Sequence, residues 1–511
     1  MDDWTHGYDV SVGYTHSFYR EMAPDWLDLC ARLGGQAPPP GRNDEAFRYL
    51  ELGCGQGTGL CLLAAANPAG EFVGIDFLPE HIAHARGLAE AAGLTNVRFE
   101  EGDFVALAAR WPADLGAFEY VTLHGVYSWV SPAVRQAVVD CLRHATAPGG
   151  LVYNGYNAQP GWLGTMPFQH ITRLIKETSE KPSPEVLNDS IDLFERLRAG
   201  GATTFKILPG LAARLTSMKQ RSAGYLVGEY LHEHWHPLWH SEVAKEFAGA
   251  DLNYVGSATL SDTLLPGVLP PSLRDTVLAQ FDERLQQDIL DLVINQFFRR
   301  DLFTRGHRPT SQTNIQGVSD TQLRRLSTPS GDLQVRTTFG EIALQGAAFA
   351  EVMEALQAGP RPIHDLVTIP GLRRQGQANA INILLLLLEA QALALAPVNP
   401  GDASPARSLN RVLARGAAQG APYDFIAAPA VGSALQVTST DLVILDAWLS
   451  HSPREDLDAQ SLGQRLVGRL PEGATRSNNG SAPTAAQANE ADLAAGFLQT
   501  TLPRWQALGA V

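Results

Sequence analysis

The sequence predicts an α/β fold in which a mainly parallel sheet is followed by helical insertions and then by a mainly helical C-terminal domain. Three observations carry this prediction. Short apolar runs alternate with amphipathic stretches from Phe47 onward, a glycine-rich segment follows the first of these runs, and from about Leu333 the pattern is mostly helical. Alternating strands and helices are typical of βαβ units, whose helical crossovers make neighbouring strands parallel.

The size and composition of the chain limit the classes of protein to consider. Its 511 residues are too many for one hydrophobic core, so we expect two or three domains. The formal net charge of -15 would repel phosphate backbones, which disfavours a nucleic-acid partner. The four cysteines show no metal-ligand spacing, and we expect buried thiols in a reducing compartment.

No membrane span is expected. The most apolar run, residues 381–396, is too short to cross a bilayer comfortably and contains Asn382, Glu389 and Gln391, so a buried helix is the better interpretation. The polar and acidic first residues do not resemble a secretory signal. We therefore expect a cytoplasmic protein.

Five apolar runs are the candidate strands of the sheet. In chain order they read RYLEL, EFVGID, VRFEEGD, YVTLH and LVYNGYN, and the amphipathic segments 78–92 and 132–146 are the clearest connecting helices. Further helical patterns follow at 167–197 and 272–297. The segments LNYVGSATL and FFRRDLFTR are expected to be late strands of the same sheet, separated by helical insertions.

The strongest functional signal is the segment YLELGCGQGTG, which begins at Tyr49. A strand that carries Glu51 runs directly into Gly53, Gly55 and Gly57. Glycines are needed where the backbone turns sharply and approaches a ligand that a Cβ atom would block, and the next helix offers its N-terminal amides. A nicotinamide dinucleotide site would place a third glycine three residues after the second, and a pyrophosphate would not favour a neighbouring carboxylate. Glu51 instead suits a cationic ligand, such as an amino-acid ammonium beside a sulfonium.

Acidic residues after the next two strands support a nucleoside ligand. Asp76 ends the second strand, where a carboxylate can accept hydrogen bonds from both ribose hydroxyls. Asp103 follows the third strand and is placed to accept from an adenine amino group, with Phe104 beside the ring. Phe77 and Gly102 adjoin these two acids and complete the predicted contacts.

This constellation resembles the class I methyltransferase superfamily, whose Rossmann-like sheet binds S-adenosylmethionine. A narrower resemblance, to bacterial methyltransferases with a methyltransferase regulatory domain, is carried by YDVSVGYTHSFY, LHGVYSWV, VGEYLHEHWHPLWHSEVAKEF, LNYVGSA and FFRRDLFTR. That family is typified by lysine methyltransferases that modify outer-membrane surface proteins. The resemblance implies an S-adenosylmethionine-dependent methyltransferase whose acceptors are the lysine side chains of a protein. Family members tend to have His-Glu before Tyr-Leu, where this chain has Gly228-Glu229, and a proline where it has Gly13.

The resemblance and the composition together divide the chain into five regions. Residues 1–45 are expected to be a helical segment over the cofactor site, and 46–165 the Rossmann-like core. Residues 166–310 are a helical insertion and regulatory region that carries the late strands. Residues 320–400 resemble a winged-helix-like module, and 401–511 are a C-terminal region whose polar stretch at about 471–486 is expected to be a disordered loop.

Residues after the fourth strand are the candidates for the reaction itself. Tyr127 and Trp129 follow this strand at the edge of the sheet where loops face the ligand, and aromatic rings attract ammonium and sulfonium cations. An apolar, aromatic pocket would also desolvate a lysine and favour the loss of its proton. His124 would either accept a proton or only contact the cofactor. The resemblance implies that Tyr14 closes the cofactor from above.

Four histidines, His232, His234, His236 and His240, raise the question of a metal site. Helical spacing would place only some of them on one face, Pro237 makes a continuous helix unfavourable, and no cysteine lies nearby. We therefore expect no metal, and we favour surface or substrate-cleft histidines.

Three functions are compatible with the sequence. The first is a methyltransferase for protein lysines, the second a methyltransferase for a small molecule such as a natural product or lipid precursor, and the third a regulatory protein that keeps the fold without turnover. Glu51, Asp76 and Asp103 are intact, which argues against the third. The large accessory regions favour a bulky substrate, so a protein partner is preferred to a small molecule.

Overall fold

The computed structural model describes residues 16–39, 46–221, 223–306, 312–327, 331–344, 346–451, 457–470 and 489–511. Tyr14 and the polar stretch at about 471–486 lie outside the described residues. Within the described part of the chain, no helix is long and apolar enough to cross a membrane.

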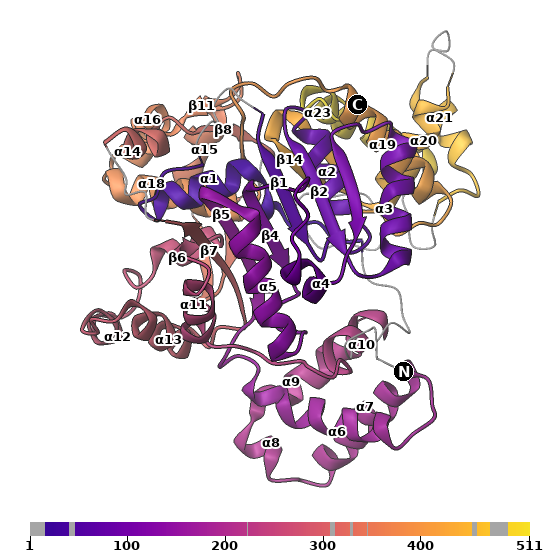
Figure 1. The fold of residues 1–511 in the computed structure, drawn as a ribbon. Helices are drawn as coiled ribbons and strands as arrows, with labels where there is room; N and C mark the ends of the chain where they lie inside the picture. Colours follow the sequence, from indigo (N-terminus) through magenta and orange to yellow (C-terminus); the bar gives the residue numbers. More distant parts are fainter. Residues whose placement is uncertain are drawn as a thin grey trace.

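A seven-stranded sheet forms the centre of the molecule, with the strand order β3-β2-β1-β4-β5-β7-β6 (Figure 1). The strands β1 to β5 are parallel, whereas β7 runs antiparallel to both of its neighbours. The seven are β1 (Arg48–Leu52), β2 (Glu71–Asp76), β3 (Val97–Glu101), β4 (Phe118–His124), β5 (Thr146–Asn157), β6 (Leu252–Ser257) and β7 (Phe298–Arg305). The five early strands and the two late strands predicted from the sequence are confirmed, and the carboxyl ends of β1 to β5 meet at one edge.

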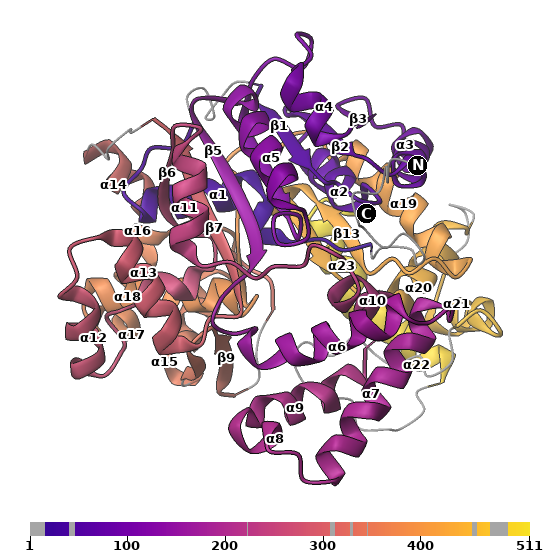
Figure 2. The same ribbon diagram turned by 60° about the horizontal axis from the view of Figure 1, so that its bottom comes forward.

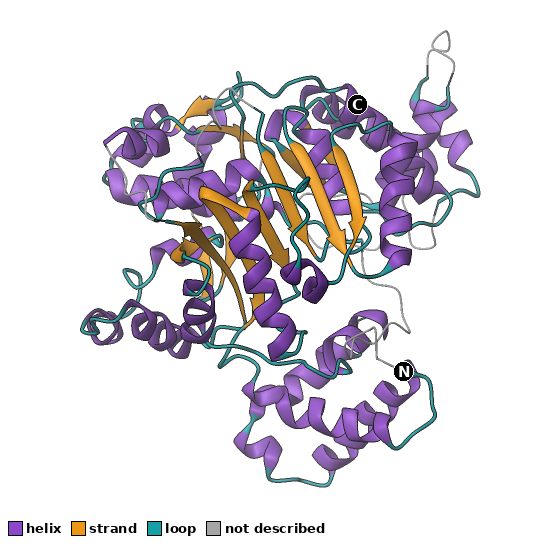
Figure 3. Ribbon diagram, in the orientation of Figure 1, coloured by secondary structure: helices purple, strands orange, loops and turns teal. Residues whose placement is uncertain are grey.

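Helices cover both faces of this sheet, and each face has its own apolar core (Figure 3). On one face α1 (Pro24–Leu33), α2 (Thr58–Ala66) and α3 (Pro79–Ala92) pack against alternate strand residues such as Tyr49. On the other face α5 (Pro132–Ala145) and α11 (His240–Ala248) pack against the intervening residues such as Leu50. This alternation follows from the period of two along a strand.

Short polar residues at the strand ends begin the helices that follow. The side chain of Ser131 accepts a hydrogen bond from the Val134 amide, and proline at the next position begins α5 without losing a needed N–H. Asp103 caps α4 (Phe104–Ala109) in the same way, accepting from the Ala106 amide at 2.9 Å. The predicted nucleoside-binding acid is therefore also a helix cap.

A separate group of helices, which we call the helical lobe, lies off the carboxyl edge of the parallel strands (Figures 1 and 2). It comprises α6 (Met166–Glu177), α7 (Ser183–Ala199), α8 (Thr204–Ile207), α9 (Pro209–Met218) and α10 (Ala223–Tyr230). Its core includes Trp162, Phe168 and Phe194, so the lobe has an apolar interior of its own. After α10 the chain is not helical until α11 begins at His240, which confirms that the histidine segment is not one continuous helix.

The region between α11 and β7 contains two helices where the sequence pattern predicts one. They are α12 (Pro271–Leu278) and α13 (Glu283–Ile294), preceded by the 3-10 turn η3 (Leu260–Leu264). Asp282 separates them because its side chain accepts from the Arg284 amide and so begins a new helix. The prediction of one helix over 272–297 is therefore wrong in this detail.

The C-terminal part is mixed, and the expectation of a mainly helical domain is corrected here. Three small sheets are formed by β9 (Leu333–Thr337) with β10 (Gly340–Leu344), by β8 (Gln322–Arg325) with β11 (Arg361–Pro362) and β12 (Leu393–Leu395), and by β13 (Phe425–Ala428) with β14 (Ser433–Gln436). The helices are α14 (Gln312–Ser319), α15 (Gly346–Ala355), α16 (Ile363–Leu366), α17 (Pro370–Arg373), α18 (Gln377–Glu389), α19 (Ser404–Ala418), α20 (Ser439–Leu449), α21 (Ala459–Leu466), α22 (Glu490–Gly496) and α23 (Leu502–Ala507). The apolar run predicted as a buried helix forms α18, and its last residues form β12.

This C-terminal part packs directly on the cofactor-binding half. Helix α19 and strands β13 and β14 contact α2, the helix that follows the glycine bend. Helix α2 is consequently buried on nearly all sides, which explains why its residues are apolar all round. The winged-helix-like arrangement of residues 320–400 stays a prediction.

Candidate functional site

The bend after β1 requires glycine at defined positions. Gly53 and Gly57 have φ of +75° and +71°, in the left-handed region that side chains disfavour. A Cβ atom on Gly57 would lie 2.3 Å from the Cβ of Ala85 and 2.8 Å from Cε1 of Phe99, so the bend and helix α3 leave no space for one. The sharp, side-chain-free turn predicted from the sequence is confirmed.

Asp76 holds this bend in place from the end of β2. One carboxylate oxygen accepts from the Gly55 amide at 2.8 Å, and the other accepts from the Leu78 amide at 3.0 Å and lies 3.3 Å from Nδ1 of His81. The side chain is 6% exposed. Each carboxylate oxygen can accept a second hydrogen bond, so the predicted ribose contact is compatible with these backbone contacts.

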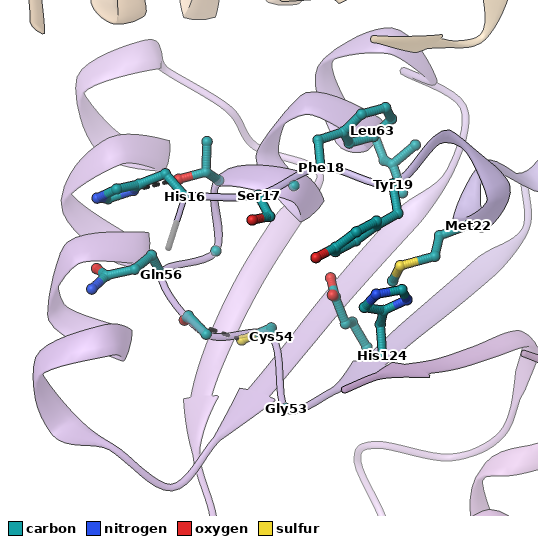
Figure 4. Close-up of a pocket in the computed structure, with 15 residues that line it drawn as sticks. His16, Ser17, Phe18, Tyr19, Met22, Gly53, Cys54, Gln56, Leu63 and His124 are labelled. Carbon is teal, nitrogen blue, oxygen red and sulfur yellow. Dashed lines mark hydrogen bonds between the residues drawn. The ribbon is translucent and has the colours of Figure 1, made fainter. Parts of the chain in front are cut away.

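Two connected pockets lie on either side of the bend. The first, the loop pocket, has a volume of about 570 Å³ and the second, the strand-end pocket, about 790 Å³. Gly53, Gly55 and His124 line both of them. The loop pocket is completed by His16, Ser17, Phe18, Tyr19, Met22, Glu51, Cys54, Gln56, Gly57, Thr58, Gly59 and Leu63, several of which are labelled in Figure 4. The strand-end pocket is completed by Asp76, Phe77, Leu78, His81, Asp103, Phe104, Gly125, Val126, Trp129, Val130 and Val134.

The structure brings almost all of the predicted cofactor residues to these two pockets. Gly102 lies just behind the strand-end pocket, where its amide donates to the Asp76 carbonyl at 3.0 Å. Tyr14 is outside the described residues. The sequence analysis did not single out Ser17 and Tyr19, which come from the same N-terminal segment as Tyr14 and reach the pocket over the glycine bend.

Glu51 is the charged group at the base of the loop pocket. Burial, reinforced by the neighbouring charge of Asp76, raises the pKa of Glu51 to about 8. A carboxylate held in this way is stabilised in its ionised form by an added cation. The pocket therefore suits the ammonium group of an amino acid, as the sequence predicted.

His124 lies where the two pockets meet. Its ring stacks on Tyr19 with centroids 3.6 Å apart (Figure 4). Its Nδ1 is 2.8 Å from the Tyr153 hydroxyl. Burial and the positive charge of Arg300 lower the pKa of His124 well below its usual value. The ring is therefore neutral and a weak base, so its position supports a cofactor contact better than proton acceptance.

Of the two predicted catalytic aromatics, only Trp129 reaches a pocket. Trp129 lines the strand-end pocket and lies against His232, with ring centroids 5.3 Å apart. Tyr127 is 0% exposed, and its hydroxyl donates to Glu246 on α11. The prediction for Tyr127 is corrected, because its ring faces the α5–α11 core and lines neither pocket.

The histidines of the 232–240 segment do not act together. His232 is buried beside Trp129, and His240 is buried with its Nδ1 2.9 Å from Asp301, whereas His236 is exposed. The expectation that they are surface or cleft residues is therefore wrong for His240. In the described part of the chain, no group of three or more suitable side chains is arranged to hold a metal ion.

A buried acidic residue to which the sequence pattern assigned no role interacts electrostatically with Tyr19. Glu229, on α10, is 8% exposed, and its carboxylate is 4.0 Å from Arg214. Burial outweighs the charge of Arg214 and the contacts with Tyr225 and Asn157, and it raises the pKa of Glu229 to about 7. The signals in the sequence were its place in the segment VGEYL and the His-Glu that the resembling family tends to have there, and neither indicates what this side chain faces.

Comparison with known proteins agrees with this site. Residues 43–181 match a family described as a methyltransferase domain, and residues 222–305 match one described as a predicted methyltransferase regulatory domain. An uncharacterized protein of Synechocystis is 35% identical over 367 residues, which are 71% of each chain. A demethylmenaquinone methyltransferase of Thermus thermophilus is 39% identical over 103 residues, covering 20% of this chain and 44% of that protein.

Among solved structures, PKMT2 from Rickettsia typhi in complex with AdoHcy (S-adenosylhomocysteine) has a similar fold over nearly the whole length. The TM-score is 0.69 at 16% identity, covering 96% of this chain and 98% of that one. The fold, the glycine bend with its acids and the two matched families lead to one assignment. The chain belongs to the S-adenosylmethionine-dependent methyltransferases that carry a methyltransferase regulatory domain.

Proposed function

We propose that this methyltransferase modifies lysine side chains of protein substrates. The observation that carries the proposal is the fold shared with PKMT2 across 96% of the chain, which includes the helical lobe and the C-terminal part as well as the cofactor half. At 16% identity this likeness concerns the fold, and the name of that protein supplies the acceptor class. The demethylmenaquinone methyltransferase, whose name gives a small-molecule acceptor, matches only 20% of the chain. This likeness supports the use of the methyl donor and says nothing about the acceptor.

The donor fits the two pockets in one orientation. Asp76 and Asp103 would receive the ribose hydroxyls and the adenine amino group in the strand-end pocket, with Phe77 and Phe104 beside the ring. Glu51 would receive the ammonium group in the loop pocket. In this orientation the sulfonium would lie near His124, which lines both pockets, and its methyl group would face Tyr19.

The protein's contribution to such a reaction is alignment and desolvation. S-adenosylmethionine supplies an electrophilic methyl group, and an attacking nitrogen must lie in line with the bond that breaks. The rings of Tyr19 and Trp129, which line the two pockets, offer aromatic faces to cations. A lysine side chain, long and cationic, has the right shape and charge for such an approach.

The test is transfer of a labelled methyl group from S-adenosylmethionine into a fractionated bacterial cell extract. We expect the label in protein, and acid hydrolysis should release it as methylated lysine. Extract whose lysines have been acetylated is the matched control and should accept nothing. Label found only in small molecules, or in residues other than lysine, would overturn the proposal.

A further inference from the structure

The buried carboxylate of Glu229 is set apart from the other acids of the site by its neighbours. Its ion pair with Arg214 is long, at 4.0 Å, and Arg214 is engaged elsewhere. The guanidinium lies over the ring of Trp162 at 4.6 Å, and its Nε donates to the Tyr230 hydroxyl at 2.8 Å. A buried carboxylate whose neighbouring cation is held at this distance is poorly neutralised, so it favours the arrival of another cation.

The position of Glu229 relative to the cofactor pockets follows from a chain of contacts. Helix α10 lies off the carboxyl ends of the parallel strands (Figures 1 and 2), and Asn157, the last residue of β5, lies beside Glu229. The Asn157 amide donates to Ser128 at 2.8 Å, which fixes this strand end against the loop after β4. Tyr19 is near enough to Glu229 for the two to interact electrostatically, and Tyr19 stacks on His124 at the junction of the pockets.

Four groups from different elements face this carboxylate. They are Arg214 at the end of the ion pair, Arg221 in the turn before α10, Tyr225 one helical turn earlier, and Asn157. The side chains of Tyr225 and Asn157 favour the ionised carboxylate as polar neighbours, and the two arginines favour it by charge. Burial opposes all four, and as a result the carboxyl group changes its charge near neutral pH.

We propose that Glu229 binds the ammonium group of the acceptor and takes up the proton that this group must lose. The proposal rests on the proposed function, and it names the acceptor site as the space between Glu229, Tyr19 and His124. The nitrogen then carries a lone pair that forms a bond to the methyl carbon. The carbon–sulfur bond breaks with its electron pair remaining on sulfur, so the products are a methylated amine, S-adenosylhomocysteine and a protonated Glu229.

The other candidate proton acceptors are less suitable. His124 has a pKa well below its usual value and is a weak base, whereas Tyr127 and Glu51 are in the wrong place: Tyr127 faces a different core, and Glu51 lies in the loop pocket on the ammonium side of the cofactor. A general base works best when its pKa lies near the working pH. With a pKa of about 7, Glu229 meets this condition.

Sinefungin tests the proposal without requiring a known acceptor, since it carries an amine in place of the sulfur-bound methyl group. The ratio of its affinity to that of S-adenosylhomocysteine is the sinefungin preference. It measures whether a carboxylate lies close enough to bind the amine that stands in the position of the methyl group. In Glu229→Gln we expect this preference to fall by about tenfold or more, because a charge-assisted hydrogen bond is lost. Affinity for S-adenosylhomocysteine should be unchanged, which also shows that the variant is folded. The same substitution at Glu246, which pairs with Tyr127 outside both pockets, is the matched control and should change neither affinity.

Turnover supplies a second readout. With the wild-type protein and extract protein as acceptor, kcat/KM should level off above about pH 7, because ionised Glu229 can then act on a protonated amine. In Glu229→Gln the rate should fall by about 100-fold or more, and it should keep rising with pH toward the pKa of the free amine. Glu229→Asp should retain the wild-type profile shape at a lower rate.

The results separate the two proposals. An unchanged sinefungin preference in Glu229→Gln overturns the role of Glu229, even if the label enters lysine. A lost preference together with label in small amines would retain Glu229 as the acceptor carboxylate and would overturn only the protein substrate.

Discussion

The cofactor side and the acceptor side of this site are built in different ways. On the cofactor side, one short segment carries Glu51, Gly53, Gly55 and Gly57, and Asp76 accepts a hydrogen bond from the backbone of this segment. On the acceptor side, Tyr19, Asn157, Arg214 and Glu229 come from four elements that are far apart in the chain. The first can therefore be found from a local pattern, whereas the second exists only once the helical lobe has folded against the strand ends.

A buried charge network on β7, away from both sides of the site, predicts the largest effect. Asp301, fully buried on β7, receives hydrogen bonds from Arg299 at 2.9 Å and Tyr156 at 2.6 Å, and lies 2.9 Å from Nδ1 of His240. We expect Asp301→Asn to lower the free energy of unfolding by about 3–5 kcal/mol, because the charge of Arg299 loses a buried partner. Urea unfolding followed by circular dichroism measures this change.

The same residue predicts how stability depends on pH. Burial alone would raise the pKa of Asp301, but the charge of Arg299 and the contacts with His240 and Tyr156 lower it to about 2. A folded-state pKa below the unfolded value contributes stability above about pH 4, which is lost as the pH falls toward 2. Asp301→Asn should lack this contribution, so the difference in the free energy of unfolding between wild type and variant should be smaller at pH 3 than at pH 7. An equal difference at the two pH values would contradict the account.

On the cofactor side the expected effect is on binding. Asp76→Ala removes the ribose acceptor and the hydrogen bonds from the Gly55 amide of the bend and from the Leu78 amide, so affinity for S-adenosylhomocysteine should fall by about tenfold or more. Asp76→Asn, which keeps the shape but only one acceptor oxygen, should lose less. Calorimetric affinities equal to wild type in both variants would contradict the placement of the nucleoside in the strand-end pocket.

Glu51 predicts a pH dependence of cofactor binding. Its raised pKa of about 8 means that the ligand-free carboxyl is largely protonated at pH 6, and an ammonium ligand requires the ionised form. Binding should therefore release a proton, and affinity should rise by up to about tenfold per pH unit between pH 6 and 7.5. Above about pH 8 the ligand's own amino group loses its charge, so the affinities are compared only at lower pH. Glu51→Gln should bind the ligand more weakly, and its affinity should change little with pH. The same pH dependence of affinity in variant and wild type would contradict the assignment of Glu51 to the ammonium group.

The smallest expected effect lies at the contact between the C-terminal part and the glycine bend. His84 Nδ1 donates to the Gln56 carbonyl at 2.7 Å, so in the neutral ring Nε2 accepts from the Tyr423 hydroxyl at 3.0 Å. Tyr423→Phe should cost about 0.5–1.5 kcal/mol of stability and weaken cofactor binding slightly. If the two side chains act as one unit, His84→Ala should lower the free energy of unfolding less in the Tyr423→Phe variant than in the wild-type protein.

The sequence predicted those parts of the fold that local patterns specify. The seven strands, the glycine bend and the strand-end acids each follow from residues close together in the chain. Three things could not be read in this way. Tyr127 follows a strand at a position typical of a site, but packing against Phe247 turns it into the core. The role of Glu229 could not be read from its local segment, because its neighbours Arg214 and Asn157 come from other elements. The small C-terminal sheets pair residues such as Leu323 and Leu395, whose partnership depends on the fold between them.

The most direct test of the account is a crystal structure with sinefungin bound. The account predicts the adenine beside Phe77 and Asp103, the amino-acid ammonium near Glu51, and the amine that replaces the methyl group directed past His124 toward the Glu229 carboxylate. Sinefungin in the reverse orientation, or with that amine directed away from α10, would contradict it.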